Sequence, residues 1–172
     1  MKASVVGLFL HERHGERPRA VAEVAGRVGG GIEGDSHAQR VRRAVVVVDR
    51  STHDALGLAP GDLREQITTA GLPEIGRLPS GTELRLGELT LRVTGAAEPC
   101  THIGELLGVP DVVAFRASLA GRRGATCTVV AAEGPARVGD AVEVLPARGR
   151  LTPFRDPVAA VPQPSLRLQP RK

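Results

Sequence analysis

The sequence predicts a mainly β fold in which short strands close into a barrel-like structure with a few short helices. Apolar and polar residues alternate in many short segments, glycine and proline punctuate the chain between them, and helical spacing is rare. Many short strands with two minor helices favour a compact barrel over alternating β-α-β units.

The first half of the chain contains most of the expected strands. The apolar stretch from Ala3 to Leu10 predicts the first strand, and the alternation from Val21 to Val28 predicts a second, which a run of glycines ends. The β-branched run from Ala44 to Val48 is typical of a strand that is covered on both faces. Residues Gly61 to Thr68 are polar, and they predict a loop that leads into a short strand.

Two short helices interrupt these strands. Ser51 is a suitable N-cap for a helix from Thr52 to Leu56, which Gly57 can end in a left-handed conformation. Apolar residues between Val112 and Leu119 have helical spacing, so we expect a second helix there.

The remaining strands come from the second half. Apolar residues alternate with polar ones from Leu84 to Val93 around Gly87, as in a hairpin with one buried face. Thr126 to Ala131 and Ala141 to Leu145 predict two further strands with turn residues between them. The predicted domain therefore covers residues 1–145.

Composition limits the classes of partner. Residues 146–172 are predicted to be an extended or disordered tail, with six of the thirteen prolines, six basic residues and one acidic residue, so the net charge of +4 belongs to this tail. With only three aromatic residues, we expect no nucleic-acid binding by base stacking. No apolar run reaches the ~18 residues of a membrane span, and no leader pattern precedes the first strand, so a cytoplasmic protein is expected.

Cys100 is the first candidate for chemistry. It follows the predicted hairpin after the run Thr94 to Pro99, whose glycine and proline should end the strand, so we expect Cys100 in a loop on a rigid scaffold. An exposed thiolate there is a nucleophile or metal ligand, whereas a buried cysteine packs as a small hydrophobic residue, and spacing alone leaves both open. Cys127 lies in an apolar strand and is expected in the core. The spacing of both cysteines with His37 and His102 disfavours a zinc site.

The second candidate is the glycine-rich loop from Gly31 to Ala38. Within it, Gly34, Asp35 and His37 combine backbone freedom with a carboxylate and an imidazole, and the backbone amides could hold an anion. Ordinary turn chemistry explains the same residues equally well. Arg43 follows, and arginine suits bidentate binding of phosphate or carboxylate.

Five segments, taken in chain order, resemble the MOSC domain, which is named for the C-terminal part of molybdenum-cofactor sulfurase. The segments are 34–38, 61–72, 78–87, 98–100, and the ending that runs from 121–125 through 137–142. Together they cover most of the chain from Val5 to Leu145.

The resemblance implies a β-rich barrel and a functional cysteine at Cys100. In relatives this cysteine binds the molybdenum of a pyranopterin cofactor or handles sulfur destined for it, and some relatives, such as the mitochondrial amidoxime-reducing component, reduce N-hydroxylated compounds. We therefore expect Cys100 to bind molybdenum and His37 to deliver protons, because an imidazole titrates near neutrality. The residues expected to bind the cofactor are Gly34, Asp35, Arg43, Gln66 and Thr94.

Two residues depart from the family pattern. Gln66 stands where the family commonly has asparagine, and Ala44 stands where small members often have glutamine. The extra methylene of Gln66 moves its amide by about one bond length, enough to disturb a fixed contact with the cofactor.

Two other functions fit the same residues. Cys100 can carry a persulfide and transfer sulfur without a metal, with Glu98 and His102 favouring the thiolate. Alternatively, the chain is a module that stores or delivers the cofactor without turnover. A reductase or sulfur transferase of this kind acts on a small molecule and needs a separate electron-donor or sulfur-donor protein.

Overall fold

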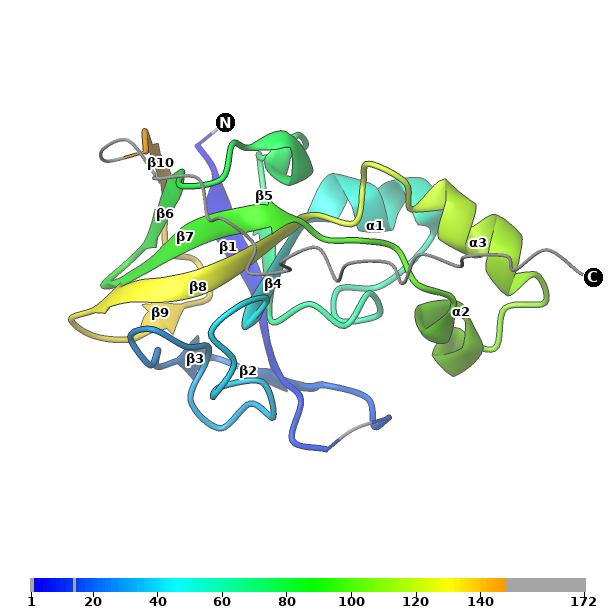
Figure 1. Cartoon of the computed structure of the whole chain (residues 1–172), viewed down its shortest axis with the longest axis horizontal. Coiled ribbons are helices and arrows are strands. Elements are labelled where there is room, and N and C mark those ends of the chain that lie inside the picture. The colour runs from blue at the N-terminus through cyan, green and yellow to red at the C-terminus, as the bar shows by residue number, and fades with distance from the viewer. Residues whose placement is uncertain (1, 14, 148–172) are drawn as a thin grey trace, which may run out of the picture.

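The computed structural model describes residues 2–13 and 15–147. Within these residues the chain forms an eight-stranded sheet, a two-stranded sheet and short helices (Figure 1). The strands are β1 Ser4–Leu10, β2 Arg19–Val21, β3 Glu23–Val24, β4 Val45–Asp49, β5 Ile67–Ala70, β6 Glu83–Leu86, β7 Leu89–Ala96, β8 Ala125–Ala132, β9 Ala136–Arg137 and β10 Val142–Leu145. The helices are α1 Arg50–Leu56, α2 Thr101–Leu107, α3 Val112–Ser118 and the 3₁₀ helix η1 Ile75–Arg77.

The large sheet has the strand order β10-β6-β7-β8-β4-β5-β1-β2, and β3 pairs with β9 in the small sheet. β4 and β5 are parallel, and α1 lies in the connection between them, as a parallel pair requires a crossover. The β6–β7 hairpin turns at Gly87, as its alternating pattern predicts. The mainly β prediction is confirmed.

The predicted closed barrel is not confirmed, because the large sheet stays open. Its two ends approach each other at the start of β1, where Ser4 and Ala141 form an isolated bridge and the Val5 N–H donates to the Asp140 carbonyl at 2.9 Å. This contact does not extend into a paired ladder. From Leu8 onward β1 pairs with β2 instead.

The single strand expected from Val21 to Val28 is also wrong. The chain changes partner at Ala22, because β2 pairs with β1 whereas β3 pairs with β9. Periodicity reports which side chains face the core, and it does not report a change of partner strand.

Capping residues define the first helix. The Asp49 side chain, rather than Ser51, is the N-cap of α1 and accepts the Ser51 N–H at 3.1 Å, while Gly57 ends the helix with a φ of 65° as predicted. The second expected helix is α3, and the sequence did not predict α2, which begins directly after Cys100.

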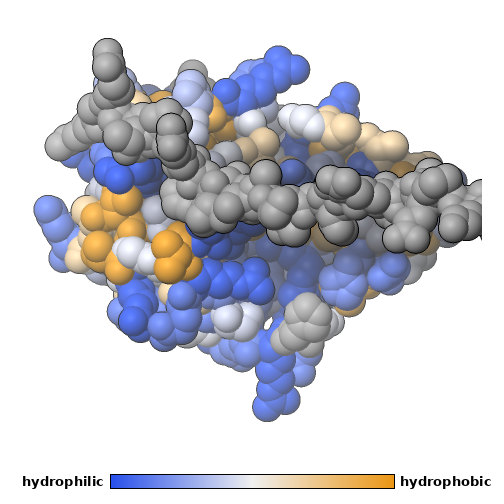
Figure 2. Space-filling view, viewed as in Figure 1, coloured by the Kyte–Doolittle hydropathy of each residue, from blue (hydrophilic) through white to orange (hydrophobic). Residues whose placement is uncertain are grey.

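Two groups of buried apolar residues stabilise the fold. The larger group fills the inside of the curved sheet, and a smaller one, which includes Val48, Leu63, Ile103 and Leu119, lies beneath the helices. Figure 1 shows α1, α2 and α3 together at one end of the molecule, beyond the main part of the sheet. The face in Figure 2 is mostly hydrophilic. The hydrophobic residues on this face gather at the end of the molecule opposite the helices.

Among the described residues, no helix combines the length and the apolar character that a bilayer crossing requires. The predicted tail lies outside them from residue 148 onward.

Candidate functional site

A pocket with a volume of about 400 Å³ lies where segments distant in sequence meet. The loop before β4, the residues before β5, the junction between β7 and α2, and the start of β8 contribute to it. Its lining includes four arginines and two histidines: Arg40, Arg43, Arg64, Arg123, His37 and His102. In the described lining the acidic residue is Glu98, which is exposed and lies 3.7 Å from Arg43. The pocket therefore favours an anionic ligand.

Cys100 lies on the wall of this pocket and is exposed. It is the N-cap residue of α2, with the extended dihedral angles φ −133° and ψ 154°, and its side chain makes no capping hydrogen bond. The expected strand end at Thr94 is wrong, because β7 pairs with β8 through Ala96 after a register shift between Val93 and Gly95. The sheet therefore holds the chain until four residues before Cys100, and the Cys100 thiol remains available.

Cys127 has the opposite environment. It lies in β8 with an exposed fraction of 0%, and burial raises the pKa of its thiol to about 12. It therefore packs as a core residue, which was the simpler of the two interpretations that the sequence left open. In the described part of the chain, the side chains that could share a metal ion are His11, Asp35 and His37, and neither cysteine joins them.

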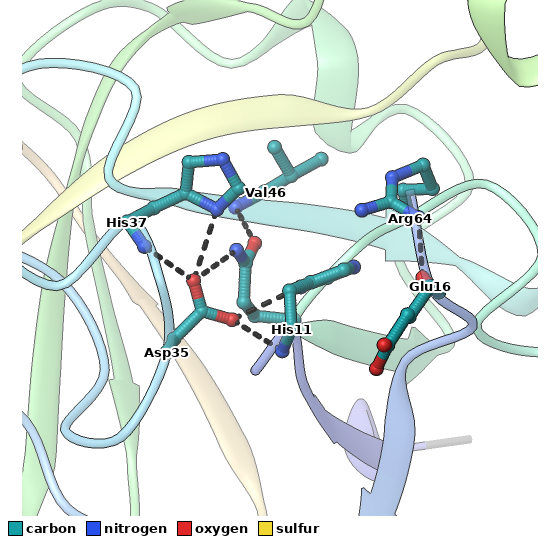
Figure 3. Close-up of polar contacts among 7 residues, drawn as sticks. His11, Glu16, Asp35, His37, Val46 and Arg64 are labelled. Atoms are coloured by element: carbon teal, nitrogen blue, oxygen red, sulfur yellow. Dashed lines mark hydrogen bonds and ion pairs between the residues drawn. The ribbon is translucent and has the colours of Figure 1, made fainter. Parts of the chain in front are cut away.

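Asp35 lies behind the pocket, with a side chain that is fully buried between two histidines (Figure 3). Its Oδ1 accepts the backbone N–H of His37 at 2.8 Å and lies 3.0 Å from His37 Nδ1, while Oδ2 has the same two contacts with His11, at 2.8 and 3.0 Å. Burial alone would raise the pKa of Asp35, but these hydrogen bonds outweigh it and hold that pKa well below its usual value. Asp35 is therefore an ionised carboxylate.

Gln66 connects this carboxylate to the sheet. Its Oε1 accepts the Val46 N–H of β4 at 2.8 Å, and its Nε2 donates to Asp35 Oδ1 at 3.3 Å. Gln66 also lines the pocket, but these bonds occupy both ends of its amide. The longer side chain that departs from the family pattern thus holds β4 and the Asp35 loop together.

Arg64 approaches the pocket from the residues before β5. Its backbone is left-handed, with a φ of 57°, and its Nη1 donates to the Glu16 carbonyl at 2.8 Å (Figure 3). Desolvation lowers the pKa of Arg64, and the negative charges of Asp35 and of a Cys100 thiolate oppose this shift. The Arg64 guanidinium therefore lies within electrostatic range of both Asp35 and Cys100.

Arg123 reaches the same pocket from the segment before β8. It is 7% exposed, and its Nε and Nη1 are buried without a hydrogen-bond partner among the described residues. Desolvation lowers its pKa, while the charges of Glu65 and of a Cys100 thiolate oppose the shift. A buried guanidinium with unused donors in a cationic pocket is a site for an oxyanion, because an unsatisfied buried charge is costly.

Comparison with known proteins identifies the family. The sequence model of the MOSC domain matches residues 34–143, which is more than half of the chain. The chain belongs to the MOSC family. No curated protein matches it.

Solved structures share the MOSC fold. The YuaD protein from Bacillus subtilis is similar with a TM-score of 0.73 at 23% identity, over 84% of this chain and 96% of that one. YiiM from Escherichia coli has a TM-score of 0.62 at 20% identity, over 87% and 72% of the two chains. YiiM from Geobacillus stearothermophilus has a TM-score of 0.64 at 17% identity, over 84% and 75%. At these identities the likeness concerns the fold.

The pocket that contains Cys100, called the MOSC pocket from here on, brings together part of the predicted site. His37, Arg43, Gln66 and Cys100 line it, whereas Asp35 lies behind His37. Gly34 does not line the pocket, and it has a left-handed φ of 81° where the loop turns before Asp35. Thr94 lies in a neighbouring pocket that shares Arg43 and Thr126 with this one, and its hydroxyl lies 3.0 Å from the Thr126 carbonyl oxygen.

Sequence reasoning missed three arginines of the MOSC pocket, Arg40, Arg64 and Arg123. Arg64 and Arg123 lie inside segments that resemble the family, so the motif positions could have indicated them. The sequence also did not indicate the partner of His11, which is Asp35, or the partner of His53, which is Glu65. Both partners are distant in sequence, and no local pattern reports them.

Proposed function

We propose that this MOSC domain binds a molybdenum-pyranopterin cofactor in the pocket at Cys100 and reduces N-hydroxylated small molecules there. The observation that carries the proposal is one pocket that combines an exposed cysteine with buried donors of Arg123, which have no hydrogen-bond partner among residues 2–13 and 15–147. Family membership supports a general MOSC function. The proposed cofactor and reaction rest on the side chains that line the pocket.

The chemistry of the donor set fits this cofactor. A soft thiolate is a suitable ligand for the metal. Cys100 is exposed and can supply one, whereas Cys127 is buried. A pyranopterin carries a phosphate group, and Arg123 and Arg64 offer guanidinium groups that match such an oxyanion. Cys100 would thus hold the metal, and the arginines would hold the negatively charged remainder of the ligand.

Proton supply is the task of His37. Reduction of an N-hydroxyl group consumes two electrons and two protons, breaks the N–O bond and releases water. The chemistry that the bound cofactor supplies is the two-electron reduction itself, with the electrons coming from a separate donor protein. Because Asp35 accepts a hydrogen bond from His37 Nδ1, the opposite nitrogen, Nε2, is the atom that would take up a proton from solvent and pass it to the leaving oxygen.

Arg43 and Thr94 occupy more peripheral positions. Arg43 Nη2 lies 3.7 Å from Glu98 Oε2. Both side chains are exposed, so this ion pair lies at the edge of the pocket. Arg43 also lines the neighbouring pocket that contains Thr94. In the proposal these two residues would help to hold the cofactor at the edge of the pocket.

Persulfide transfer is the second candidate function. It is favoured by the thiol of Cys100, which is exposed and unused in helix capping, and by the arginines Arg64 and Arg123 in the same pocket. Here the Cys100 thiolate takes the outer sulfur of a persulfide on a donor protein, whose own thiolate leaves, and Cys100 then passes that sulfur to an acceptor, with no metal. A carrier that releases intact cofactor without turnover is the third possibility.

The experiment is anaerobic purification from a host that makes molybdenum cofactor, followed by metal analysis, pterin analysis and intact mass. We compare the wild type with Cys100→Ser and with the matched control Cys127→Ala. We expect molybdenum and pterin in the wild type and the control, and their loss in Cys100→Ser. Retention of the metal in Cys100→Ser excludes Cys100 as its ligand. An added sulfur on Cys100 without metal establishes persulfide transfer instead.

Turnover separates the reductase from the carrier. The loaded protein receives electrons from a chemical reductant, and the substrate is a simple N-hydroxylated amidine. Conversion to the amidine supports the reductase, whereas stable loading with no conversion supports the carrier.

A further inference from the structure

We infer that His11 is a positioning residue of the pocket, which acts through Asp35 to hold the ring of His37 in the tautomer that leaves Nε2 free to exchange protons. The use of His37 as a proton donor rests on the proposed function. The arrangement of the three side chains does not depend on it.

The Asp35 carboxylate is shared symmetrically by the two histidines. Each oxygen lies 3.0 Å from one imidazole Nδ1 and 2.8 Å from the backbone nitrogen of the same residue, with His37 on Oδ1 and His11 on Oδ2. The two rings lie edge to face, with their centroids 5.9 Å apart. Figure 3 shows Asp35 between them.

This arrangement determines the tautomers. An ionised carboxylate only accepts hydrogen bonds, so the Nδ1 atom of each ring must carry the hydrogen. The Nε2 atom of a neutral ring then has a free lone pair. For His37, which is partly exposed, that atom belongs to a side chain on the pocket wall. For His11 it is buried and has no hydrogen-bond partner among the described residues, so His11 itself has no access to a ligand.

His11 contributes more than one contact to this geometry. It follows the end of β1, and its carbonyl accepts the Ser36 N–H at 2.8 Å, so it binds both the Asp35 side chain and the backbone of the next residue in the loop. Its Nδ1 and backbone nitrogen fix Oδ2, which prevents the carboxylate from rotating away from His37. The position of His37 therefore depends on His11, although no hydrogen bond joins the two rings.

A metal ion shared by His11, Asp35 and His37 is the competing interpretation. Their ligand atoms lie within 4.8 Å of one another. However, a metal needs free lone pairs, and here each Asp35 oxygen already accepts N–H groups from the backbone and a histidine side chain. The hydrogen bonds therefore favour positioning over metal binding.

The experiment measures the ring ¹⁵N chemical shifts of His37 by NMR in the full chain without cofactor. His11→Leu removes the donor, whereas His11→Asn keeps one, because the amide nitrogen of asparagine lies three bonds from Cα, as Nδ1 does. We expect a dominant Nδ1–H form in the wild type and in His11→Asn. In His11→Leu we expect the Nδ1 and Nε2 shifts to move toward each other as both tautomers become populated.

Two results overturn the inference. One is the same His37 shifts in all three proteins, which makes His11 a structural residue only. The other is a bound transition metal in the wild type that is lost in His11→Asn, which makes the cluster a metal site. If His11→Leu does not fold, His11→Ala, which also removes the ring donor, gives the same comparison. Because the protein is measured without cofactor, failure of cofactor loading leaves this result unaffected.

Discussion

His53 Nε2 lies 2.8 Å from Glu65 Oε1, and both side chains are fully buried. The same oxygen accepts the Gly61 N–H and the Thr68 hydroxyl, each at 2.7 Å. Burial alone would raise the pKa of Glu65, but His53 and these donors hold it below its usual value. The pair connects α1 to the residues before β5, and it places a negative charge near Arg123. Support for the pocket thus comes from a buried carboxylate behind it, which His53, Gly61 and Thr68 all contact.

Glu65→Gln should destabilise the fold by about 2 kcal/mol, because it removes a buried carboxylate that accepts hydrogen bonds from Gly61 and Thr68 and contacts His53. The measurement is urea unfolding near neutral pH. The control is Asp54→Asn, which removes an exposed ion pair with Arg50 and should change the free energy of unfolding by less than about 1 kcal/mol. Similar small losses in both variants would contradict the role of the buried pair.

Asp35 should make stability depend on acid pH. Its pKa in the folded chain lies below the ordinary value of 3.8, so its contribution is fully present above that value and is lost as the pH falls through and below it. Asp35→Asn should therefore be less stable than the wild type near neutrality, with the difference shrinking below about pH 4. Urea unfolding at a series of pH values measures this. A constant difference across the series would show that the Asp35 charge does not contribute.

The two cysteines should differ in reactivity. Cys100 is exposed, whereas Cys127 is buried and its pKa is raised to about 12, so iodoacetamide should modify only Cys100 in the folded protein. Intact mass should show one added group in the wild type, none in Cys100→Ser, and two after unfolding in urea. Rapid labelling of Cys127 in the folded protein would mean that β8 opens readily.

Arg123→Gln should weaken cofactor binding about 10-fold to 100-fold, the effect of losing charged hydrogen bonds. The control is Arg122→Gln, which removes an exposed neighbour that does not line the pocket. Cofactor retained after dialysis is measured for both variants and for the wild type. Equal retention in the two variants would remove Arg123 from the proposed oxyanion site.

Gly124 should tolerate alanine worse than Gly121. Both have a positive φ, 88° and 71°, but an added Cβ at Gly124 would overlap the Val47 carbonyl of β4, whereas Gly121 has open space. The Gly124 carbonyl also accepts the Ala97 N–H at 2.9 Å, which holds the segment before Cys100 against the segment that carries Arg123. Thermal unfolding should show a larger loss for Gly124→Ala. Equal losses would mean that strain in φ, and not the close approach, decides the effect.

Patterns within short segments predicted most strands, because alternation and turn residues act locally. The same reasoning failed where a tertiary contact decided the outcome. β2 and β3 separate because they pair with different strands, and β7 continues past Thr94 because β8 accommodates a register shift.

For the candidate site, the sequence motifs indicated Cys100 and His37, and both line one pocket. Their roles stay predictions. The burial of Arg123 was not predictable, because arginine side chains are mostly exposed in proteins and no local pattern indicates an exception. The contact of His11 with Asp35 joins residues 24 positions apart, and only the return of the loop to the end of β1 creates it.

The location of Cys127 inside the sheet limits how Cys100 can be oxidised. A disulfide between the two cysteines of the chain would require β8 to leave its place between β4 and β7. A sulfenic acid formed at Cys100 therefore has no second thiol of the same folded chain to condense with. Under mild oxidation the products should be mixed disulfides with small thiols or dimers crosslinked through Cys100, both of which a reductant reverses.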